Sequence, residues 1–117
     1  MKNTKKQGFL RFIIYKRPKD KLYTGVCLDL DIVEQSENME RLKKSLVEAA
    51  FGYVEAVCKK DLSEQLLNHP APKKYWKILV ELEAYLHSIH QVESAKEQIP
   101  AIDSQVFVRQ VQNPCVA

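Results

Sequence analysis

Two aspartates are the first residues whose spacing could support chemistry. Asp29 and Asp31 stand two positions apart near the end of an expected strand, so their carboxylates would point the same way. A metal-dependent nuclease needs further carboxylates that converge on the same face, and no further pair is visibly placed to complete such a set. Aspartate also favours turns, because its side chain bonds to the local backbone. We therefore interpret both as turn residues and expect no catalytic residues.

A second group of residues could bind zinc. Glu83, His87 and His90 lie at positions i, i+4 and i+7 of an expected helix and share one side of it. Polar residues at this spacing are common on the solvated face of a helix, and we prefer that interpretation. We expect neither a metal nor another cofactor.

The cysteines favour a reducing compartment. Cys27, Cys58 and Cys115 are odd in number and widely spaced, and no Cys-x-x-Cys pair occurs. No histidine lies in an obvious partnering motif, which argues against a nucleophilic thiol. Because free thiols that behave as small hydrophobic residues are typical of reducing compartments, we expect a cytoplasmic protein with three free thiols that is not an enzyme.

The composition is that of one folded domain. The chain has 117 residues, of which 45% are apolar and 28% charged, with a formal net charge of +3. That apolar share can build a core, whereas a protein that coats a phosphate backbone usually has a denser basic surface. No apolar run approaches the ~18 residues that cross a bilayer, so we expect no membrane partner.

Hydrophobic patterning predicts three antiparallel strands followed by a helix. Alternating apolar residues indicate strands over residues 9–15, 22–30 and 32–35, with a charged turn at 17–21. Gly25, inside the second strand, indicates a bulge or a place where another element packs very closely. From Met39 the apolar period changes to 3.6, which predicts a helix to about Lys60 with Asn38 or Ser36 as its N-cap.

The C-terminal part of the chain adds a second helix. Apolar residues from Tyr75 to Ile89 predict a helix over about residues 73–90, after the proline loop at 69–72. The segment from Ile102 to Val111 is either a late strand or unstructured. We therefore expect an α+β protein, with a two-layer β-β-β-α(-β) domain at residues 1–66 and a helical extension at 67–117 packed on the same domain.

Residues 9–57 resemble a known family. The segment from Tyr23 to Val33 is similar to the second strand and turn of HicB-family antitoxins, and it reads Tyr-Thr-Gly-Val-Cys-Leu-Asp-Leu-Asp-Ile-Val. Two later parts of the family pattern are matched by Ser36-Glu37-Asn38 and by Glu48-Ala49-Ala50-Phe51-Gly52-Tyr53. The chain departs from the pattern where Ser36 replaces a glycine and where Glu40-Arg41-Leu42 replaces Glu-Glu-Ala.

The resemblance implies a HicB-like fold and an antitoxin that neutralises a small HicA-type mRNA-cleaving toxin by occlusion. Family members commonly carry a C-terminal DNA-binding module, but the order of the expected elements fits neither a ribbon-helix-helix nor a helix-turn-helix. We therefore do not expect DNA binding. The alternatives are an orphan HicB-fold protein that homo-oligomerises without a toxin and, less favoured, a ribonuclease-H-like nuclease remnant that uses Asp29 and Asp31.

Exposure patterning suggests two sets of contact residues. Tyr15, Tyr23 and Glu34 are the expected toxin contacts, on an exposed sheet face and the outer helix surface. The helix over 73–90 has apolar residues around much of its circumference, so it either packs across the remaining sheet face or contacts another protomer. We favour a homo-oligomer whose interface contains Tyr75, Trp76 and Leu79.

Overall fold

The structure is a computed structural model that describes residues 2–91 and 103–112. The described strands are β1 (Gln7–Lys16), β2 (Tyr23–Cys27), β3 (Ile32–Ser36) and β4 (Asp103–Gln112). They form one sheet in the order β3-β2-β1-β4, and every neighbouring pair is antiparallel. The helices are α1 (Met39–Lys59), the 3-10 turn η1 (Glu64–Leu67) and α2 (Lys73–Gln91). The prediction of an α+β protein with an antiparallel sheet is therefore confirmed.

Of the two alternatives left open for the segment that ends near Val111, the late strand is the one observed, as β4. It pairs with β1 over its whole length, from Gln7 opposite Gln112 to Lys16 opposite Asp103. Because β4 pairs with β1 in one sheet, the C-terminal strand and the N-terminal strand contribute to the same core.

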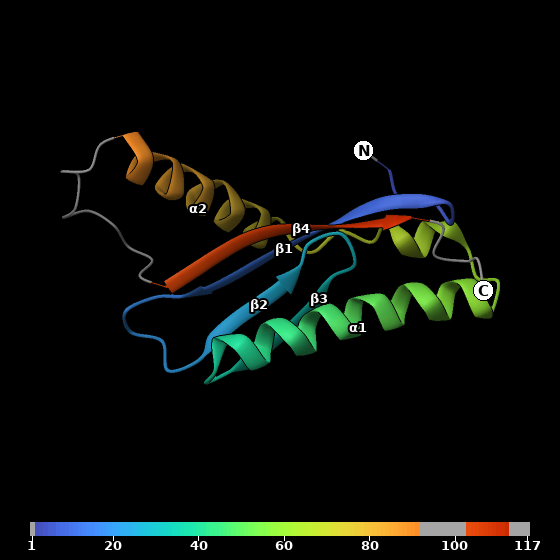
Figure 1. Cartoon of the computed structure of the whole chain (residues 1–117), viewed down its shortest axis with the longest axis horizontal. Helices are drawn as coiled ribbons and strands as arrows, with labels where there is room; N and C mark the ends of the chain where they lie inside the picture. The colour runs from blue at the N-terminus through green and yellow to red at the C-terminus, as the bar shows by residue number, and fades with distance from the viewer. Residues whose placement is uncertain (1, 92–102, 113–117) are drawn as a thin grey trace.

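The sheet lies between two helices (Figure 1). Helix α1 covers one face, and α2, expected as an extension packed on the same domain, covers the other and adds a third layer. Strand alternation sends Leu10 and Phe12 of β1 to one face, where they join a core cluster with α1. Ile13 and Tyr15 point to the opposite face and join a second cluster with Leu79 and Leu82 of α2. The sequence indicated that much of the α2 circumference is apolar. The structure shows that these apolar residues pack against the sheet of the same chain.

Local signals set the ends of α1 and of β2. The side chain of Asn38 accepts a hydrogen bond from the backbone N–H of Arg41 at 3.0 Å, which confirms the predicted N-cap. The second strand ends at Cys27, three residues earlier than predicted, because the chain turns through residues 28–31. Asp31 has a φ of 57° in this turn, a left-handed conformation that aspartate tolerates better than most residues.

Gly25 lies where side chains of α1 pack closely against the sheet. A Cβ atom built at this position would lie 3.0 Å from Cδ2 of Leu46 and 3.2 Å from Cγ of Leu42. The strand register continues through Gly25 without a bulge, opposite Ile14 and Glu34. Of the two reasons considered for a glycine here, close packing of another element is the correct one.

We expect Gly25→Val to destabilise the fold by about 1–3 kcal/mol, because the added atoms overpack a site bounded by two buried leucines. The control is Gly52→Val on the exposed side of α1, where an added Cβ meets nothing within 4 Å. That substitution should change the free energy of unfolding by less than about 0.5 kcal/mol. Urea unfolding of both variants measures the difference; equal effects would contradict the close-approach argument.

Two cysteines behave differently from one another. Cys27 is a fully buried free thiol, and burial raises its pKa to about 12, so it stays protonated and unreactive near neutral pH. Cys58, near the end of α1, is disulfide-bonded. The prediction of three free thiols is therefore wrong for Cys58.

Candidate functional site

A partly buried ion pair lies in the turn that follows β2. Asp29 is only 7% exposed. Its Oδ2 atom accepts a hydrogen bond from the backbone N–H of Arg11 at 2.6 Å. Its Oδ1 atom accepts a hydrogen bond from Nη2 of Arg11 at 2.7 Å. The carboxylate thus clamps both the backbone and the side chain of β1, and it neutralises the guanidinium beside it.

The α2 side of the sheet holds the Arg11 side chain in place. Its guanidinium carbon lies 4.7 Å from the centroid of the Trp76 ring, a cation–π distance. Trp76 is itself anchored, because its indole N–H donates to the Ala71 carbonyl at 3.0 Å. The backbone N–H groups of Ala71 and His69 in turn donate to the carbonyls of Leu28 and Asp29, at 2.9 and 3.0 Å. The proline loop therefore positions the start of α2, and α2 positions Arg11.

This geometry gives Asp29 and Asp31 different surroundings. Both oxygens of Asp29 are engaged by Arg11, whereas Oδ2 of Asp31 lies 3.8 Å from Nε2 of His69 on the loop. The two carboxylates thus have separate partners, as expected of turn residues. Within residues 2–91 and 103–112, no group of three or more His, Cys, Asp or Glu side chains is placed to hold a metal ion. Of the three residues considered for zinc, the His90 side chain lies outside the described part of the chain.

A shallow groove lies beside the ion pair, at the part of the sheet that α2 leaves uncovered. It has a volume of about 260 Å³ and is lined by Asn3, Phe9, Arg11 and Val108. Phe9 and Arg11 come from β1 and point to the α2 side, and Val108 stands opposite Arg11 on β4. Val108 is 51% exposed, unusually high for a valine within a sheet. The groove therefore offers apolar walls and a guanidinium whose charge is already compensated.

The lining of this groove suits binding better than catalysis. Phe9 and Val108 supply apolar contact area, and the stem of Arg11 can add more. None of its four lining residues is a carboxylate, histidine, cysteine or serine that could serve as a nucleophile or general base. A partner's apolar side chain is the occupant that this surface fits.

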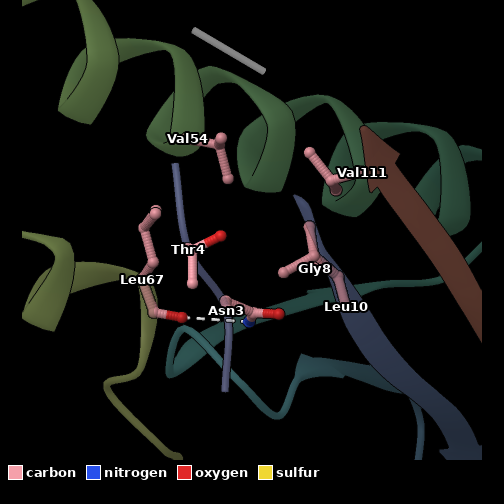
Figure 2. A pocket seen from close by; sticks show the side chains of 7 residues that line it. All are labelled: Asn3, Thr4, Gly8, Leu10, Val54, Leu67 and Val111. Carbon is pink, nitrogen blue, oxygen red and sulfur yellow. Dashed lines mark hydrogen bonds between the residues drawn. The ribbon is translucent and has the colours of Figure 1, made fainter. Parts of the chain in front are cut away.

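Two other hollows lie near the N-terminal segment. One, of about 310 Å³, is lined by the polar stretches Lys2–Thr4 and Ser63–Gln65 together with Asn68. The other lies between α1 and the ends of β1 and β4 (Figure 2). It measures about 10 Å³, close to the space that one water molecule needs, so it has no room for a larger ligand. Asn3 closes it, donating through Nδ2 to the Leu67 carbonyl at 3.0 Å.

The structure separates the three residues predicted to contact a toxin. Tyr15 is 9% exposed beneath α2, so the expectation that it lies on an exposed sheet face is wrong. Glu34 faces α1 instead and accepts a hydrogen bond from Ser45 at 2.7 Å. Tyr23 also lies on the α1 side, with the ammonium of Lys16 5.2 Å from its ring centroid. These residues do not form one surface.

The three residues predicted for an oligomer interface lie in the chain's own core. Leu79 is buried in the cluster between α2 and the sheet, and Tyr75 and Trp76 pack against that cluster. The alternative in which α2 packs across the remaining sheet face is the one observed. The overlooked residues are Phe9, Arg11 and Val108; the valine alternation in residues 106–111 was the available signal for the last of them.

Comparison with known proteins adds no relative. No protein-family model matches the chain, and neither the curated proteins nor the solved structures contain a match. Among the residues that the structure describes, no helix is long and apolar enough to span a membrane.

Proposed function

We propose that this chain is a binding protein of the HicB-like antitoxin type, which neutralises a small HicA-type mRNA-cleaving toxin by covering its active surface. The observation that carries the proposal is the groove lined by Phe9, Arg11 and Val108. Both sheet faces are largely occupied by the chain's own helices, so this groove is an apolar sheet surface left open for a partner. The resemblance of residues 9–57 supplies the class of partner.

Occlusion requires binding surface and no catalytic group in the antitoxin. An apolar side chain of the toxin would enter between Phe9 and Val108, where it removes exposed apolar area from water. The Arg11 side chain is held by Asp29 and Trp76 before any partner arrives, which lowers the entropic cost of forming the interface.

The proposal predicts that a small basic protein, the toxin, is encoded beside the gene for this chain, and the test uses that protein. That protein, expressed alone, should arrest growth, and co-expression of this chain should restore it. Val108→Glu should raise the dissociation constant of the complex by about tenfold or more, because it places a charge in an apolar contact. The control, Val33→Glu, changes a 41% exposed valine on β3, outside the groove, and should rescue growth like the wild type.

The two parts of the proposal fail separately. If the neighbouring protein does not arrest growth, or arrests it regardless of this chain, the antitoxin function is wrong. If the wild type rescues growth and Val108→Glu rescues it equally with unchanged affinity, the function stands but the groove is not the binding surface.

A further inference from the structure

Among the residues that the structure describes, no strand pairs with the outer edge of β4. It is the last strand in the order β3-β2-β1-β4, and its ten residues pair with β1 on one side only. The pairing runs without interruption from Asp103 to Gln112, and the strand contains neither proline nor a bulge. Proteins usually protect such an edge, because its unpaired N–H and C=O groups can accept another strand. The opposite edge, β3, has only five residues.

We propose that β4 pairs in antiparallel fashion with β4 of a second copy of this chain, centred on Val106. In this register Val106 lies opposite its own counterpart, and Asp103 of each copy lies opposite Arg109 of the other. Asp103 and Arg109 are the two charged residues of β4, and Val106 lies midway between them. An antiparallel pair centred on Val106 is therefore the register that places them opposite one another. The twofold symmetry of the dimer forms this charge pair twice.

The register also decides how the two copies are arranged. Because a residue stands opposite itself, the twofold axis is perpendicular to the sheet, and equivalent faces of the two sheets lie on the same side. The dimer would be a continuous eight-stranded sheet with both α1 helices on one face and both α2 helices on the other. A shift by one residue would place α1 beside α2 and would separate Asp103 from Arg109.

The cations beside this edge support the charge pairing. The guanidinium of Arg109 lies 5.4 Å from the Phe107 ring centroid, and the ammonium of Lys43 lies 4.9 Å from the same ring. Among the described residues, neither cation has a carboxylate within ion-pair distance. A carboxylate from a second copy, opposite Arg109, supplies the missing partner.

The dimer does not depend on toxin binding, and it differs from the α2 interface expected from the sequence. Its contacts come from the backbone edge of β4 and from both faces of the strand, with Val106 on the α2 side and Phe107 and Arg109 on the α1 side. The charge pair that selects the register lies on the α1 side. The groove at Phe9 and Val108 lies on the α2 side.

The test is a charge exchange measured by light scattering after size-exclusion chromatography, at about 100 µM chain. The wild type should have twice the mass of one chain. Arg109→Asp and Asp103→Arg each place like charges opposite one another at two sites and should raise the dissociation constant about tenfold or more. The double variant with both changes should restore it to within about threefold of the wild type.

A matched control separates specific pairing from altered net charge. Arg41→Asp, on the exposed side of α1, changes the charge by the same amount and should leave the dimer intact. Far-UV circular dichroism must show each variant folded. A monomeric wild type, a dimer indifferent to Arg109→Asp, or a folded double variant that stays monomeric would each overturn the proposal.

Discussion

Asp29→Ala should lower the free energy of unfolding by about 2–3 kcal/mol. The substitution removes the acceptor for three hydrogen bonds at once, one from the backbone and two from the guanidinium of Arg11. Breaking a buried ion pair costs about 3–5 kcal/mol when the remaining charge cannot reach water. Here the Arg11 side chain is 41% exposed, so water screens part of that penalty and the expected cost is smaller.

A double-mutant cycle distinguishes the ion pair from simple loss of packing. Arg11→Met preserves much of the side-chain stem over Trp76 but removes the charge. If Asp29 and Arg11 stabilise the fold through one another, the double variant should be destabilised by clearly less than the sum of the two single changes. Urea denaturation gives all three values; additive effects would contradict the coupling. Because Arg11 lines the groove, the same variants also report on partner binding.

Phe12→Ala should be the most damaging single substitution, at about 3–5 kcal/mol. Phe12 is fully buried beneath α1, and its ring stacks on that of Phe107 with centroids 4.8 Å apart and planes 8° apart. Removing the ring leaves a cavity in the centre of the sheet and deprives β4 of its main aromatic contact with β1. A domain of this size has about 5–15 kcal/mol of stability in total, so the variant should be close to unfolding.

The control for this prediction is Phe51→Ala. Phe51 lies on α1 and is 37% exposed, so its truncation should cost less than about 1 kcal/mol. Thermal unfolding monitored by circular dichroism compares the two variants. Similar melting temperatures would show that the Phe12–Phe107 stack contributes little to the core.

The binding groove illustrates a site that sequence patterns do not reveal. Phe9 and Arg11 stand two positions apart in a predicted strand and therefore share a face, but Val108 is almost a hundred residues away in the chain. Only the pairing of β1 with β4 brings Arg11 opposite Val108. The Arg11–Asp29 pair likewise joins β1 to the turn that follows β2, and nothing in the spacing of those residues specifies it.

The sequence by itself determined the local elements of this protein. Alternation specified the first three strands, and a period of 3.6 specified both long helices. The N-cap of α1 was narrowed to Asn38 or Ser36, and Gly25 to a bulge or a close approach. These signals are local because a strand or helix repeats its apolar face every few residues. Tertiary structure decided which surfaces meet: α2 covers its own sheet, Tyr15 becomes buried, and β4 is the edge strand of the sheet that the described residues form. The physical reason is that hydrophobic burial is non-directional, so an apolar stripe specifies that a side chain leaves water but not which partner covers it.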